Sequence, residues 1–165
     1  MRATIHWNGK VRFTGVAGSG HAVAIDGPPE MGGENAGVRP MELMLLGLGG
    51  CTAFDVVEIL RKGRQRVLDC RAEISAERAE DEPKVFTRIH VHFVVVGEGV
   101  DERRVQRAID LTARKYCSAS IMLERGGVAI SHDFEVQECP SATEPGRNVG
   151  RRSQALTPAD VPPKA

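Results

Sequence analysis

One stretch of the chain decides its fold class: residues 40–64, which read PMELMLLGLGGCTAFDVVEILRKGR. Pro40 suits the start of a helix, because the missing N–H of a proline would be unpaired in the first turn anyway. Apolar residues cover more than one face of this helix, and a helix of that kind belongs inside a protein. The stretch is interrupted by glycines, Glu42 and Asp55 and becomes polar at Arg61. It therefore predicts a buried helix and not a membrane span.

Three glycines lie inside this predicted helix, at Gly47, Gly49 and Gly50. Each costs about 1 kcal/mol of helix stability relative to alanine. Glycines at these positions would allow another backbone or a ligand to approach the helix closely. A phosphate loop is a poorer explanation, because the Lys-Ser/Thr ending and the preceding strand of that motif are missing.

The segments on either side of the helix alternate as strands do. Before it we expect strands at residues 3–7, 11–14 and 22–25, with Asn8-Gly9 as a two-residue hairpin turn. After it we expect a strand at 68–77 with one wet face, a longer strand at 85–96 pairing back on it, a helix from 101 to about 117, a helical turn at 120–124 and a last strand at 128–136. The order βββ-α-ββ-α-β with antiparallel hairpins indicates an α+β fold rather than a doubly wound parallel one.

The length and charge of the chain narrow its class further. A chain of 165 residues suits one domain, which we place at residues 1–138, with 139–165 as a disordered tail rich in Pro, Arg, Ser and Ala. Lys+Arg 22 against Asp+Glu 22 removes the electrostatic argument for nucleic acid or an anionic membrane as a partner. The N-terminus has no apolar signal segment, and four cysteines without paired CxxC motifs suit a reducing cytoplasm.

Cys51 and Cys117 are the best candidates for chemistry. Both lie on predicted helices that pack against the same sheet, so the two thiols could meet; both could equally be small buried hydrophobes, a common use of free cysteine. A reactive thiol needs a nearby cation to lower its pKa. Arg39 is the best-placed cation, and Glu42 could orient an arginine through a bidentate ion pair. Arg39 could instead be a solvated loop residue, and Glu42 a first-turn glutamate favoured by the helix dipole.

Three motifs resemble a known family. Residues 33–43 (GENAGVRPMEL), 47–53 (GLGGCTA) and 116–120 (YCSAS) resemble the OsmC/Ohr family of osmotically inducible and organic hydroperoxide resistance proteins. The resemblance covers Met1 to about Glu138. It implies an intertwined homodimer with active sites at the subunit interface.

The resemblance also implies an activity, that of a Cys-based thiol peroxidase acting on organic hydroperoxides, with hydrogen peroxide as a second candidate substrate. By this analogy Cys51 is the peroxidatic residue and becomes a sulfenic acid. Cys117 then resolves it as an intramolecular disulfide, which an external dithiol reduces. The analogy calls for no metal and no organic cofactor.

The chain departs from the hydroperoxide-resistance pattern at two places. The loop at residues 15–20 contains no arginine, and Met41 follows Pro40 where those proteins have a glutamate. The chain thus resembles a divergent member of the family. Arg39 and Glu42 are the residues that could replace the missing tuning network.

Other side chains have simpler explanations. His90 and His92 alternate on one strand face and could bind a metal, but no third ligand is evident and a solvated face explains them better. Cys70 lies on the apolar side of its strand and fits a structural role, and Cys139 has no evident partner. Asp55 and Glu58 fit exposed positions on the long helix.

Two other functions stay open at this point. The Met- and Leu-rich helix could line a site for a small apolar ligand at a dimer interface, without catalysis. Thiol-dependent acyl or sulfur transfer would also use Cys51 as the nucleophile.

Overall fold

The computed structural model describes residues 1–139, so the tail predicted to be disordered lies outside the described residues apart from Cys139. The elements are β1 (Ala3–Trp7), β2 (Phe13–Ala17), β3 (Ala22–Ile25), a short 3-10 turn (Pro29–Met31), α1 (Pro40–Lys62), β4 (Arg66–Arg78), β5 (Phe86–Glu98), α2 (Glu102–Leu111), a π-helical turn (Thr112–Tyr116), α3 (Ser118–Arg125) and β6 (Ala129–Glu138). The predicted α+β class is confirmed, and α1 begins at Pro40 as expected.

The strands form two separate sheets. The first is an antiparallel meander of β1, β2 and β3; the second has the order β4-β5-β6. Strands β4 and β5 pair antiparallel, but β5 and β6 pair in parallel. The sequence predicted antiparallel hairpins and gave no sign of this parallel pair, which forms because α2 and α3 make a crossover that returns the chain to the starting end of β5.

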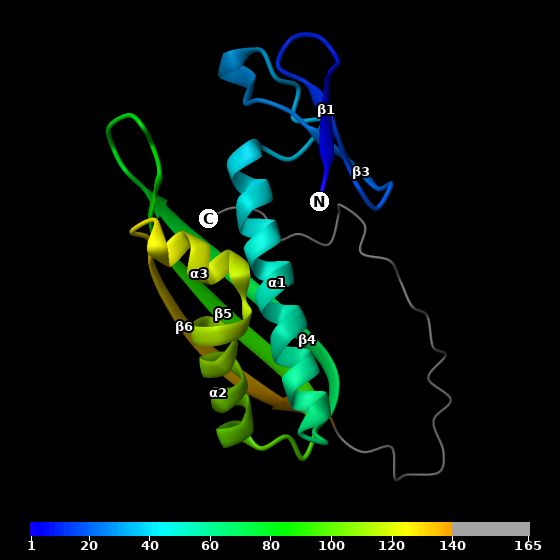
Figure 1. Ribbon diagram of the computed structural model, residues 1–165, viewed down its shortest axis with the longest axis vertical. Coiled ribbons are helices and arrows are strands. Elements are labelled where there is room, and N and C mark those ends of the chain that lie inside the picture. The colour runs from blue at the N-terminus through cyan, green and yellow to red at the C-terminus, as the bar shows by residue number, and fades with distance from the viewer. Residues whose placement is uncertain (140–165) are drawn as a thin grey trace.

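The second sheet carries the core (Figure 1). Helices α1, α2 and α3 lie against one of its faces, and α1 runs diagonally across it. The fully buried side chains come from α1, β5 and α2: Leu48, Val56, Leu60, Val91, Phe93, Val95, Val105 and Ile109. Alternate residues of β5 face the helices, as expected for a sheet covered on one side.

Helix α1 is also long and apolar enough to cross a membrane by length and composition, and only 28% of its most apolar window is buried in the chain. The core helix of a globular protein passes the same test. Leu48, Val56 and Leu60 of α1 lie fully inside the core, which favours that interpretation.

Two local expectations were wrong. Trp7 pairs with Phe13, so residues 8–12 form a longer loop than the expected two-residue turn, and Lys10 adopts a φ of 50° within it. A β-bulge between Val67 and Asp69 interrupts the alternation of β4. Leu68 is therefore 59% exposed instead of facing the core.

The first sheet lies at the N-terminal end of α1, away from the second sheet (Figure 1). Every residue of β1 is exposed, including Ile5 at 59% and Trp7 at 69%. Within one chain this meander therefore leaves its apolar side chains uncovered.

Asp26 organises the loop that connects β3 to α1. Its side chain is 1% exposed. Oδ1 accepts a hydrogen bond from the Gly27 N–H at 2.8 Å, and Oδ2 accepts from the N–H groups of Glu34 at 2.9 Å and Ala36 at 3.0 Å. These donors, Ala36 foremost, lower the pKa of the Asp26 carboxyl. The loop that leads into Pro40 is thus held in place by one carboxylate.

Candidate active site

Cys51 lies in the middle of α1, where the helix packs closely on β4. A side-chain carbon at Gly49 would come within 2.8 Å of the Ile74 Cδ1, so glycine lets α1 approach β4 without a shift of the Ile74 side chain. Gly47 and Gly50 have no described atom within 4 Å of such a carbon. Packing inside one chain therefore explains one of the three helix glycines and leaves the other two facing open space.

The sequence predicted that Cys117 ends a long helix, and this prediction was wrong. Helix α2 stops at Leu111, a π-helical turn follows, and Cys117 is extended, with φ −72° and ψ 101°, as the N-cap of α3. Its Sγ accepts a hydrogen bond from the Ser120 N–H at 3.4 Å. Single π turns occur often at functional sites. This one breaks the helix where the thiol enters the core, and Cys117 is completely buried.

The fold brings the two thiols together. The sulfur atoms of Cys51 and Cys117 and a carboxylate oxygen of Asp55 all lie within 4.8 Å of one another. Both cysteines are free thiols. A disulfide needs about 2.05 Å between the sulfurs, so bond formation requires a closure of less than about 3 Å.

Asp55 is the residue that sequence reasoning missed. It follows Cys51 by one helical turn and is half-buried, so its interpretation as an exposed helix residue was wrong. Burial raises the pKa of its carboxyl. The atom Oδ2 is buried and has no hydrogen-bond partner among residues 1–139. The only signal in the sequence was the i, i+4 spacing between Cys51 and Asp55. That spacing indicates a site only once Cys117 is known to lie beside both residues.

The two thiols differ in their surroundings. Burial, together with the neighbouring Cys51, raises the pKa of Cys117 to about 12, while the Ser120 N–H acts in the opposite direction. Cys117 is therefore held as a protonated thiol at neutral pH. Cys51 is only half-buried and is the more accessible of the pair.

Arg39 and Glu42 lie at the start of α1 and not beside the thiols. The Arg39 Nη2 donates to the Asn35 Oδ1 at 3.0 Å, and the Arg39 backbone N–H donates to the Glu42 Oε2 at 2.9 Å. Residues 39 and 51 are 12 positions apart, which is about 18 Å along a helix axis. Within one chain, neither side chain reaches Cys51.

A polar cluster lies on the open face of the second sheet. Asp133 of β6 accepts from His92 Nδ1 at 2.6 Å and lies 3.2 Å from His90 Nε2, and His90 Nδ1 lies 2.9 Å from the Ser131 Oγ. Asp133 pairs with His92 across the parallel ladder, so the sequence could not reveal this neighbour. Asp133 is 60% exposed, which fits the expected solvated strand face.

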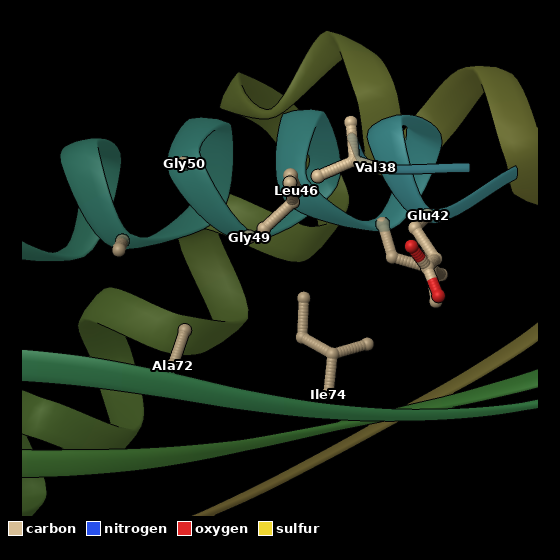
Figure 2. A pocket seen from close by; sticks show the side chains of 9 residues that line it. Val38, Glu42, Leu46, Gly49, Gly50, Ala72 and Ile74 are labelled. Carbon is tan, nitrogen blue, oxygen red and sulfur yellow. The ribbon is translucent and has the colours of Figure 1, made fainter. Parts of the chain in front are cut away.

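An apolar groove of about 780 Å³ lies between α1 and β4 and is lined by Leu45, Leu46, Gly49, Ala72 and Ile74, with Glu42 at its edge (Figure 2). Cys51 does not line it. At about 100° per residue, Cys51 lies roughly 200° around α1 from Gly49. The groove and the thiol pair therefore occupy opposite sides of the helix.

Comparison with known proteins shows which family has this arrangement of elements. The family model described as OsmC-like protein matches residues 32–133, a range that includes α1, the thiol pair and Asp55. The chain belongs to the OsmC family. The resemblance seen in the three sequence motifs is thereby confirmed.

Individual OsmC relatives extend the match. The protein YhfA of Escherichia coli strain K12 is 45% identical over 139 residues, covering 82% of this chain and 98% of YhfA. A hypothetical protein from Aquifex aeolicus has 29% identity and a TM-score of 0.69, over 83% of this chain and 97% of its own. An organic hydroperoxide resistance protein from Legionella pneumophila has 17% identity and a TM-score of 0.64, over 82% and 96%, a likeness of fold alone.

Proposed function

We propose that this OsmC family member is a Cys-based thiol peroxidase that reduces organic hydroperoxides, and hydrogen peroxide as a second substrate. The observation that carries the proposal is the thiol pair, with one accessible and one buried sulfur within 4.8 Å. Cys51 is the peroxidatic residue because the peroxide can reach it. Cys117 is the resolving residue because it is a buried thiol next to Cys51.

The reaction balances with these two residues and a reductant. The Cys51 thiolate attacks the terminal oxygen of the hydroperoxide, the O–O bond breaks, and the alkoxide takes a proton and leaves as an alcohol. The Cys117 sulfur then attacks the Cys51 sulfenic acid. The Cys117 proton leaves with the hydroxide as water, and an intramolecular disulfide forms. An external dithiol reduces that disulfide by exchange, so the cycle requires no metal or organic cofactor.

We place the reaction in the cytoplasm, because four cysteines without paired CxxC motifs suit a reducing compartment. There a dithiol pool can return the disulfide to two thiols after each turnover.

The same proposal includes a homodimer with its active sites at the interface. Phe54 is 69% exposed on α1 and Trp7 is 69% exposed on β1, and apolar surfaces of this extent call for a partner. Gly47 and Gly50 lie on the open face of α1, where a second helix could approach closely. Cys51 borders that face. A second chain would therefore close the thiol site and could bring the partner subunit's Arg39 and Glu42 toward it.

Peroxide consumption tests the activity. The reduced protein should consume an alkyl hydroperoxide with turnover when a small dithiol is present. Cys51→Ser should lower the rate at least about 100-fold, to the uncatalysed background, because the nucleophile is removed. Cys70→Ser is the matched control, since Cys70 lies on β4 outside the thiol pair, and it should keep the rate. Equal rates for Cys51→Ser and the parent protein would refute the proposal.

Sedimentation tests the dimer. The parent protein should sediment as a dimer, and Phe54→Glu should shift it toward monomer because a charge replaces an exposed apolar anchor. Val85→Glu is the control, a similar change at a 53% exposed residue beside the β4–β5 turn. A parent protein that sediments as a monomer would remove the interface and, with it, any role of the partner's Arg39.

One observation favours a second function, the binding of a small apolar ligand. The groove of Figure 2 is apolar along most of its lining. By the helical periodicity of α1 it lies on the side away from Cys51. Ala53 also lines the groove. Native mass spectrometry should then show a copurified apolar molecule that Ala53→Phe displaces by filling the groove. Ligand-free protein that also fails to bind apolar probes would exclude this function.

A further inference from the structure

Asp55 adds a third donor atom to the thiol pair. Cys51 and Asp55 are four residues apart on α1, which places their side chains on the same side of the helix. Cys117 reaches the same point from the N-cap of α3. The three donor atoms lie within 4.8 Å of one another. We propose that the reduced protein binds a thiophilic divalent cation, Zn²⁺ foremost, through Cys51, Asp55 and Cys117.

The donor set fits the coordination chemistry of zinc. Zn²⁺ binds cysteine sulfur at about 2.3 Å and carboxylate oxygen at about 2.0–2.2 Å, in a tetrahedral arrangement. Such bonds put neighbouring donors about 3.5–3.8 Å apart, so the three side chains need to close by at most about 1 Å on binding. Two soft sulfur ligands select zinc over magnesium and calcium. Three protein ligands leave the fourth position open to water or to a small molecule.

The unpaired oxygen of Asp55 supplies independent support. Its Oδ2 is buried, without a hydrogen-bond partner, and Asp55 forms no ion pair with any residue of the described range 1–139. A buried carboxylate oxygen normally has a partner, because leaving it unpaired is costly. A cation held between Asp55 and the two sulfurs would be that partner.

Burial and the neighbouring Cys51 keep the free Cys117 thiol protonated, but two features beside its sulfur would stabilise negative charge once a metal displaces the proton. The Ser120 N–H donates to Sγ at 3.4 Å, and the N-terminal end of α3 is the positive end of the helix dipole. A metal-bound thiolate retains the negative charge that these groups stabilise. Hydrogen bonds of this kind orient and tune metal ligands.

Metal binding needs the two thiols to be reduced and close together, but it needs no reaction with peroxide. The proposed site therefore stands apart from the proposed peroxidase, although both use the same sulfurs. A bound metal and a disulfide exclude each other. If the peroxidase proposal holds, a hydroperoxide takes two electrons from the two thiolates and two protons from solvent, yields alcohol and water, and releases the metal as the disulfide forms.

Cobalt is the probe for the experiment. The full 165-residue chain, reduced and freed of metal with a chelator, is titrated with Co²⁺ and then with Zn²⁺. We expect one cobalt per chain, with a sulfur-to-cobalt charge-transfer band that Zn²⁺ removes. Asp55→Asn should weaken Zn²⁺ binding by at least about 10-fold, and Cys51→Ser or Cys117→Ser should abolish the band. Glu58→Gln is the matched control on the same helix, since Glu58 lies 3.9 Å from Lys62 and outside the cluster.

Three results would overturn the site. The first is that the parent protein shows no charge-transfer band. The second is that Asp55→Asn protein binds Zn²⁺ as tightly as the parent. The third is that the band survives in both cysteine variants. Circular dichroism verifies the fold of each variant, and Asp55→Ala replaces Asp55→Asn if the latter misfolds. Peroxide consumption is measured in metal-free buffer, so loss of the metal site and loss of the peroxidase are told apart.

Discussion

Asp26 and Asp55 both have carboxylate oxygens removed from solvent, but they differ in their hydrogen bonds and in the direction of their pKa shifts. Asp26 accepts three backbone hydrogen bonds, and its pKa is lowered by them. Asp55 has a buried oxygen with no partner in residues 1–139, and burial raises its pKa. The first carboxylate is satisfied by its own loop. The second is satisfied by nothing that the described chain provides.

This difference distinguishes a carboxylate that stabilises the fold from one that lies at a candidate functional site. A carboxylate whose oxygens are all paired stabilises the fold, and Asp26 does so by fixing the loop that leads into α1. An unpaired carboxylate persists only where the surrounding fold imposes it, and such residues gather at functional sites. Asp55 lies beside the thiol pair, which is the other feature of the molecule that suggests chemistry.

The largest effect is expected at Asp26. Asp26→Ala leaves the N–H groups of Gly27, Glu34 and Ala36 without the buried carboxylate that accepts their hydrogen bonds. We expect the midpoint of thermal unfolding to fall by roughly 5–15 °C. Scanning calorimetry of the reduced protein measures this. A midpoint within a degree of the parent would show that the loop is held by other contacts.

The pH dependence of stability is expected to be a smaller effect at the same residue. The pKa of Asp26 is lower in the folded than in the unfolded protein, so its contribution is complete above the unfolded pKa, about 3.9, and is lost as pH falls through the folded value. The difference in unfolding midpoint between the parent and Asp26→Asn should stay constant from pH 7 to pH 5 and shrink below about pH 4. A difference that grows on acidification would contradict the assigned pKa direction.

The smallest effect is expected at Asp55. Asp55→Asn removes the charge from a buried and unpaired oxygen, so the reduced, metal-free protein should unfold at the same temperature as the parent or a few degrees higher, roughly 1–4 °C. Thermal unfolding at pH 7 with a chelator and a dithiol present measures this. A fall comparable with that of Asp26→Ala would mean that Asp55 has a structural partner and would end the contrast between the two carboxylates.

Local signals in the sequence were enough for most of the fold. Pro40 and the polar end of the apolar run determined the limits of α1, and alternation placed β4 and β5 within two residues of their observed ends. The short loop at Asn8-Gly9 was mistaken because Lys10 adopts a positive φ that the turn pattern did not predict. The parallel pairing of β5 with β6 depends on contacts distant in sequence, which periodicity cannot report.

The candidate site was partly accessible to sequence reasoning. Cys51 and Cys117 could be chosen from their contexts, but the π turn that places Cys117 at the N-cap of α3 has no sequence signature. Asp55 could not be recognised before Cys117 was located beside it. Arg39 was chosen for its closeness in sequence to Pro40, but the length of α1 separates it from the thiol within one chain.

The most direct test of the thiol pair is to identify the disulfide that forms. The reduced full-length chain is treated with one equivalent of an alkyl hydroperoxide, its remaining thiols are alkylated, and peptides are analysed by mass spectrometry. We expect one Cys51–Cys117 disulfide per chain, with Cys70 and Cys139 alkylated. Four alkylated cysteines after peroxide has been consumed, or a disulfide that includes Cys70, would contradict it.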